Sequence, residues 1–178
     1  IHFATILDPR PFYFWSSGAR IMAYDVPKWR IRSERPTPPG VSPELLWRTI
    51  RNEQALKAIL FLERAAHFHP DEPWVWIEIA QIYVNQLKDV RAAAKHFGRA
   101  ADMPGAPHFA ARLHAELLRR AGEEEEAYRF YRELFPELSD DDPYAMRDLV
   151  LQRIRELEDD LGIPETNRVR AEAAASRP

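Results

Sequence analysis

A repeated spacing of small and large apolar residues constrains this chain more than any other feature of its sequence. In each copy an alanine is followed four positions later by a large apolar residue and, three positions after that, by a third apolar residue. The copies are Ala58-Leu62-Ala65, Ala93-Phe97-Ala100 and Ala127-Tyr131-Leu134, offset by 35 and then 34 residues. Spacings of four and three residues share one face of a helix, so a period of this length indicates stacked helical hairpins.

Proline, glycine and capping residues divide the chain where helical hairpins need boundaries. Ser42 and the pair Asp71-Glu72 each precede a proline, which is typical of a helix start. Gly122 marks a turn between two helices. These signals predict helices over about 10–24, 43–69, 73–86, 107–120, 123–135 and 143–161. The alternation of period two that strands require is missing, so we expect an all-α fold.

One copy of the repeat resembles the tetratricopeptide repeat family in most of its marked positions. The matching residues are Trp76, Ile79, Ala80, Tyr83, Ala93, Phe97, Ala100 and Pro104. Leu87-Lys88-Asp89 departs from the family by one inserted residue, in place of its usual glycine-containing turn. The resemblance covers about residues 1–136 and implies a right-handed superhelical solenoid of antiparallel helix pairs, closed by a C-terminal capping helix.

The repeat spacing predicts one helical domain over residues 1–161. Within it we expect the end of an upstream repeat at 1–9, a repeat at 10–70 with an insertion at about 26–42, repeats at 71–105 and 106–138, and the capping helix at 139–161. Five prolines between 27 and 43 favour a non-helical connection over 26–41. Residues 162–178 are expected to form a flexible tail.

Catalytic and metal-binding patterns are missing from the sequence. With no cysteine in 178 residues, thiol nucleophiles and cysteine-ligated metals are excluded. His67 and His69 stand two residues apart and face different sides of a helix. The acidic run Glu123–Glu126 is explained by the helix dipole. We therefore expect no enzyme activity, cofactor or metal.

Charge and hydropathy narrow the classes of partner. Residues 41–178 carry nineteen basic and twenty-five acidic side chains, which disfavours nucleic acid. No apolar run approaches the ~18–20 residues of a membrane span. The chain begins at Ile1 rather than methionine, and an upstream membrane anchor is left open. The compartment, cytoplasmic or periplasmic, is not defined by these features.

The resemblance implies a concave groove lined by the first helix of each pair. The family's groove positions fall on Phe12, Trp15, Trp74, Ile77, Gln81, Asn85, Phe109, Arg112, Glu116 and Arg119. We expect a non-catalytic scaffold or adaptor that binds a peptide segment or partner helix there, as a subunit of a larger bacterial complex. An RNA-binding helical repeat and a regulatory domain of a larger enzyme are the alternatives.

Trp29, Arg30 and Arg32 form a second candidate contact inside the insertion. An aromatic side chain between cations can stack on a base beside phosphates, or dock on an acidic protein surface. The third interpretation is structural, with Trp29 buried against the solenoid.

Overall fold

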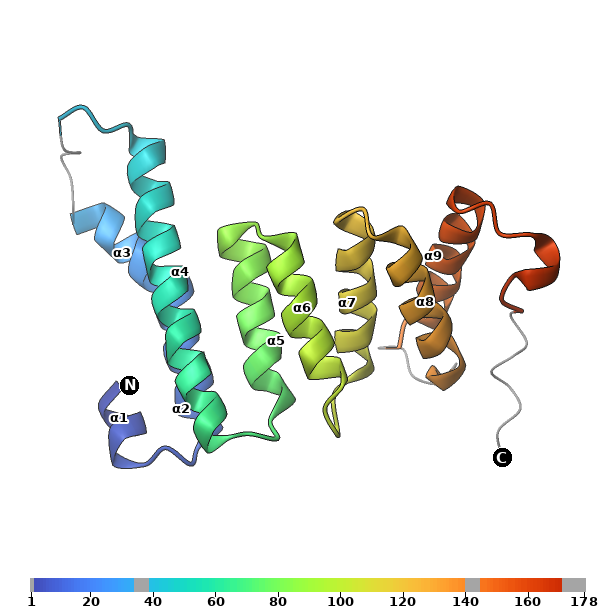
Figure 1. Ribbon diagram of the computed structural model, residues 1–178. Coiled ribbons are helices and arrows are strands. Elements are labelled where there is room, and N and C mark those ends of the chain that lie inside the picture. Colours follow the sequence, from blue (N-terminus) through green and yellow to red (C-terminus); the bar gives the residue numbers. More distant parts are fainter. Residues whose placement is uncertain (1, 34–38, 140–144, 171–178) are drawn as a thin grey trace. The chain divides into compact units, whose positions relative to one another are not determined.

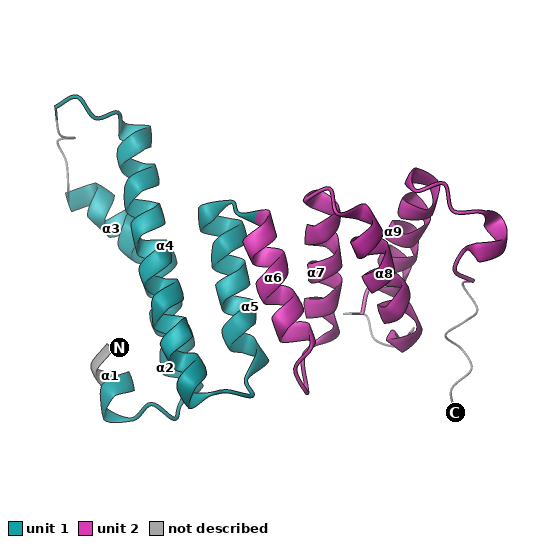
Figure 2. Ribbon diagram, in the orientation of Figure 1, with its two compact units in different colours: residues 1–89 teal, residues 90–178 magenta. Residues whose placement is uncertain are grey.

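The computed structural model describes residues 2–33, 39–139 and 145–170, and these residues form helices joined by turns, with no strand among them (Figure 1). The predicted all-α class is confirmed. The chain divides into two compact units, residues 1–89 and 90–178 (Figure 2). Because the boundary falls inside the predicted repeat 71–105, each unit is described by itself, and the continuous solenoid stays a prediction.

Unit 1 is built around one long helix. Its elements are α1 (His2–Leu7), α2 (Phe12–Arg20), the π-helical turn η1 (Ile21–Asp25), α3 (Val26–Ser33), α4 (Pro43–Phe68), α5 (Pro73–Ile82) and the π-helical turn η2 (Tyr83–Leu87). Helix α4 contacts α2, η1, α3, α5 and η2. It begins as predicted, since the hydroxyl of Ser42 accepts a hydrogen bond from the Leu45 amide at 3.2 Å. At the start of α5, the carboxylate of Glu72 caps the Trp74 amide.

Aromatic packing forms one end of the unit 1 core. The Trp15 ring is stacked on Phe68 and lies 4.7 Å from Phe61, measured between ring centroids. The carbonyl of Pro9 accepts hydrogen bonds from the Trp15 indole at 2.8 Å and from His69 Nε2 at 3.0 Å. These contacts fix the turn between α1 and α2 against the C-terminal end of α4.

The predicted non-helical connection over 26–41 is wrong in its first half. Val26–Ser33 is helical and continues directly from η1, while residues 34–38 lie outside the described part of the chain. The Val26 amide donates to the Ile21 carbonyl, five residues back. Such a wide turn accommodates Pro27, which lacks an amide hydrogen and would clash with a carbonyl in a regular α-helix.

In unit 2 each helix packs against the next. The elements are α6 (Val90–Ala101), α7 (His108–Arg120), α8 (Glu124–Leu134), the 3₁₀ turn η3 (Phe135–Glu137), α9 (Arg147–Asp160) and the 3₁₀ turn η4 (Glu165–Asn167). Gly122 has a φ of 81° and ends α7, with the Glu123 amide donating to the Leu118 carbonyl at 3.0 Å. The predicted boundaries of α7 and α8 are therefore confirmed.

Small residues of the repeat are buried inside the two units, and a glycine on α6 allows a close helix contact. Ala58, Ala93 and Ala127 are all fully buried. Gly98 on α6 faces the buried His114 ring on α7, and an added Cβ would lie 2.9 Å from the ring carbon Cε1. The ring is held by its Nδ1 donating to the Ala94 carbonyl at 2.8 Å and by an edge contact with Phe130.

Two predictions at the C-terminal end need correction. The last helix begins at Arg147 rather than 143, after Met146 in a left-handed conformation, and the predicted cap at 140–143 lies outside the described residues. The predicted tail is ordered at its start, because the Val169 amide donates to the buried Glu158 carboxylate at 2.6 Å and Arg168 pairs with Asp159 at 2.7 Å. Residues 171–178 lie outside the described part.

Candidate binding surfaces

Four of the predicted groove residues lie on α7 and share one helical face. Phe109, Arg112, Glu116 and Arg119 are each half-buried and are spaced by three, four and three residues. This spacing keeps side chains on a common stripe of a helix. Within unit 2 the structure therefore brings these predicted residues together.

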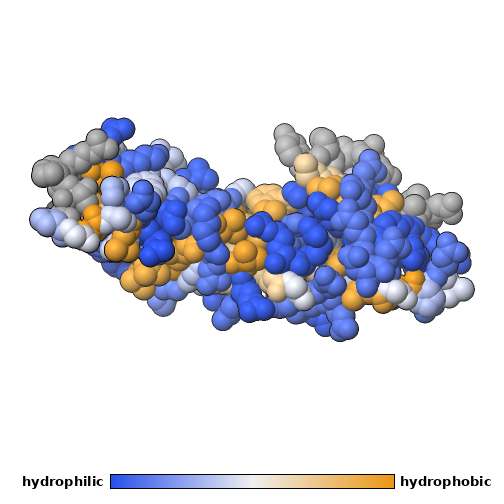
Figure 3. All heavy atoms as spheres, turned by 90° about the horizontal axis from the view of Figure 1, so that it is seen from above, coloured by the Kyte–Doolittle hydropathy of each residue, from blue (hydrophilic) through white to orange (hydrophobic). Residues whose placement is uncertain are grey.

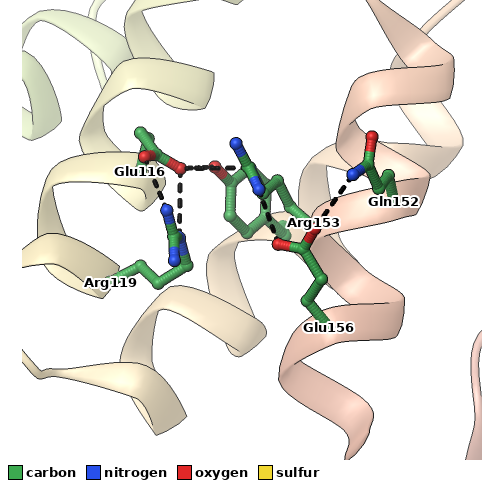
Figure 4. A network of polar contacts seen from close by, with 6 residues as sticks. Glu116, Arg119, Gln152, Arg153 and Glu156 are labelled. Atoms are coloured by element: carbon green, nitrogen blue, oxygen red, sulfur yellow. Dashed lines mark hydrogen bonds and ion pairs between the residues drawn. The ribbon is translucent and has the colours of Figure 1, made fainter. Parts of the chain in front are cut away.

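A polar network occupies the C-terminal part of this face (Figure 4). The Glu116 carboxylate accepts from Arg119 Nη2 at 2.9 Å and from the Tyr131 hydroxyl at 3.3 Å. Arg153 on α9 lies 3.5 Å from the same carboxylate and donates to Glu156 at 2.6 Å. Helices α7, α8 and α9 are thus linked through one carboxylate.

The network fixes the protonation states of its members. Burial opposes ionisation of Glu116, but the hydrogen bond from Arg119 and the charges of Arg119 and Arg153 outweigh it and hold the pKa of this carboxyl below its usual value. Burial raises the pKa of Tyr131, and the adjacent Glu116 carboxylate raises it further. Glu116 is therefore an anion and Tyr131 a neutral donor at neutral pH.

A hollow of about 180 Å³ lies beside the network, and one arginine that lines it has no ion pair among the described residues. It is lined by Arg112, Glu116, Tyr131, Leu149, Val150 and Arg153. The Nε atom of Arg112 is buried and has no hydrogen-bond partner among the described residues. Glu116 is committed to Arg119 and Arg153, and Arg112 forms no ion pair with any residue that the structure describes.

Two of the predicted groove residues of unit 1 are buried, and the others are at least partly exposed. Trp15 and Ile77 are buried in the core, so the predicted role of these two side chains in partner contact is wrong. Trp74 is 41% exposed and Asn85 is exposed, donating to the Tyr24 hydroxyl at 3.4 Å. Phe12 and Gln81 are half-buried, and Phe12 makes an edge contact with His69.

The candidate contact in the insertion is displayed on α3. Trp29 is 56% exposed, so the structural interpretation that buries it is wrong. Arg30 pairs with Glu53 on α4 at 2.6 Å, and Arg32 is exposed. Trp29 and Arg32 are accessible to a partner, whereas Arg30 is paired with the Glu53 carboxylate of unit 1.

A larger pocket in unit 1 was missed by the sequence analysis. It has a volume of about 560 Å³ and lies between α2–η1 and α4, lined by Gly18, Ile21, Met22, Lys57, Leu60, Phe61 and Arg64. Figure 3 shows hydrophobic residues reaching the surface of unit 1, at the left of that view, beside hydrophilic ones. The available signal was Leu56 and Leu60 on α4, which lie off the buried stripe and are 51% and 60% exposed.

Neither a metal site nor a membrane-spanning helix is found among the described residues. Among residues 2–33, 39–139 and 145–170, no cluster of three or more metal-binding side chains is present. No helix in that part of the chain is both long and apolar enough to cross a bilayer. Comparisons with known protein families and with curated proteins find no match for this chain.

Proposed function

We propose that the protein is a non-catalytic interaction module, a scaffold or adaptor that binds an acidic peptide segment or helix of a partner protein. The observation that carries this proposal is Arg112, which lines the hollow on the α7 face and whose Nε atom has no hydrogen-bond partner among the described residues. Arginine is enriched among residues that dominate binding energy at protein interfaces, and it recognises carboxylates through two parallel hydrogen bonds.

The surroundings of Arg112 favour a partner side chain over a structural role. Phe109 stands one turn before it on the same face, and Leu149 supplies an apolar wall. An aromatic and an aliphatic contact beside a cation suit a segment that carries an acidic residue next to an apolar one. The network around Glu116 holds the three helices rigidly, which lowers the entropy lost when a partner binds.

Selection from a random peptide library displayed on phage tests the proposal. Wild-type protein is expected to enrich peptides with an acidic residue beside an apolar residue, and Arg112→Ala protein is expected to lose that enrichment. Arg120→Ala is the matched control, because Arg120 is exposed near the end of the same helix and does not line the hollow. A wild-type protein that enriches no peptide above background would contradict the proposal.

A further inference from the structure

The pocket of unit 1 differs from the α7 face in size and in composition. At about 560 Å³ it falls within the range of small-molecule sites, which are mostly apolar with a few polar groups that orient the ligand. Its walls are apolar side chains from η1 and α4. Among the residues that the structure describes, the charged ones that line it are Lys57 and Arg64, and no carboxylate does.

The two cations of the pocket are not equivalent. Lys57 donates to Glu53 at 2.6 Å, and Glu53 also pairs with Arg30, so the charge of Lys57 is balanced inside the protein. Arg64 stands two helical turns further along α4 and has no ion pair with any residue that the structure describes. The pocket therefore offers one uncompensated cation at the edge of an apolar surface.

The π-helical turn η1 contributes one wall. Ile21 and Met22 belong to it and line the pocket together with Leu60 and Phe61 of α4. Single π-helical turns within helices occur often at functional sites, because they displace side chains from regular helical positions. Behind this wall, Phe61 is packed against the buried Trp15, so the floor of the pocket is held by the core.

We infer that this pocket binds a single-chain amphiphile with one anionic head, of the fatty acid class. The hydrocarbon chain lies between Ile21, Met22, Leu60 and Phe61, and the carboxylate pairs with Arg64. A guanidinium suits this head group because it binds a carboxylate through two parallel hydrogen bonds.

Size argues against a protein as the occupant. Seven residues from α2, η1 and α4 line the pocket, whereas a stable protein interface uses about 20–30 residues on each side. The inference is independent of the proposed function, because it concerns a different unit and none of the α7 residues.

Isothermal titration with decanoate and with 1-decanol tests the inference. Wild-type protein is expected to bind decanoate saturably at one site per chain. Arg64→Gln should weaken decanoate binding about tenfold and leave 1-decanol binding within twofold. Arg48→Gln, an exposed arginine of the same helix outside the pocket, should leave both unchanged.

The apolar wall is tested by a second matched pair. Leu60→Glu should weaken decanoate binding at least tenfold, and Leu56→Glu by less than twofold, because only Leu60 lines the pocket although both side chains are exposed. Circular dichroism of each variant shows whether it is folded, and Arg64→Gln provides a test that does not depend on Leu60.

Arg112→Ala should bind decanoate like wild type, which separates failure here from failure of the proposed function. No saturable decanoate binding by wild type, or equal losses for Leu56→Glu and Leu60→Glu, would overturn the inference.

Discussion

Gly98 controls the approach of α6 to α7. Its missing side chain leaves room for the His114 ring, which cannot retreat because Ala94 and Phe130 hold it. Alanine favours a helix interior over glycine by about 1 kcal/mol, whereas overpacking a core costs about 1–3 kcal/mol. We expect Gly98→Ala to destabilise unit 2 in urea unfolding. In a His114→Ala background the same substitution should become stabilising, and destabilisation in both backgrounds would contradict the packing argument.

Glu116 makes stability depend on pH. Its pKa is lowered in the folded state, so its contribution is fully present above the unfolded value of about 4.5 and is lost as pH falls through the folded pKa. We expect Glu116→Gln to be less stable than wild type at pH 6.5, with a smaller difference at pH 3.5. Urea unfolding at both pH values measures this.

A matched carboxylate controls the pH experiment. Glu133→Gln removes an exposed carboxylate of α8 that lies outside the first turn of the helix, and it is expected to change stability little at either pH. A difference between wild type and Glu116→Gln that stays the same at pH 3.5 would show that the ionised carboxylate is not what links the three helices.

The segment after α9 is an ordered element because of one buried carboxylate. Glu158 is fully buried, accepts from the Val169 amide and pairs with Arg155 at 2.6 Å. Removing the acceptor leaves a donor without its partner, at a cost of about 1–3 kcal/mol. We expect Glu158→Ala to abolish the hydrogen-exchange protection of the Val169 amide. Asp160→Ala, exposed on the same helix, should preserve it, and unchanged protection in Glu158→Ala would contradict this docking.

Helices could be predicted from the sequence wherever local signals agree with packing. Ser42-Pro43 and Gly122 act within a few residues, so the start of α4 and the end of α7 are readable from neighbouring positions. The prediction from Pro27 was wrong, because the π-helical turn before it avoids the steric clash that proline causes in a regular α-helix. No local sequence pattern indicates this turn. The hydrogen bond from the Val169 amide to Glu158 is a tertiary contact, so it could not be predicted from local sequence either.

In the candidate sites too, features set by local sequence could be predicted and features set by tertiary contacts could not. The α7 residues share a face because helical spacing alone sets it, whereas the burial of Trp15 depends on Phe61 and Phe68 from a helix far along the chain. The pocket was missed for a related reason. Leu60 becomes one of its walls only when η1 lies opposite, and the sequence contains no sign of that pairing.

At the scale of the whole molecule, Trp74 tests whether unit 1 contributes to partner binding. It lies in unit 1 and is 41% exposed, and the sequence predicts it as a groove residue. If a bound segment contacts it as a central anchor, Trp74→Ala should weaken binding by about 2 kcal/mol, since buried tryptophans are frequent anchors at interfaces. Thermal unfolding of the same variant shows whether the substitution acts on stability instead. An unchanged affinity in a fully folded variant would confine the site to α7.

The affinity of one selected acidic peptide for wild-type and Arg112→Ala protein tests the proposed function most directly, with Arg120→Ala as control. Loss of a central arginine–carboxylate pair is expected to cost about 2 kcal/mol, which corresponds to roughly thirtyfold weaker binding. Calorimetric titration should therefore show about a thirtyfold increase in Kd for Arg112→Ala and less than a twofold change for Arg120→Ala. Equal Kd values for wild type and a folded Arg112→Ala variant would contradict binding through the α7 face.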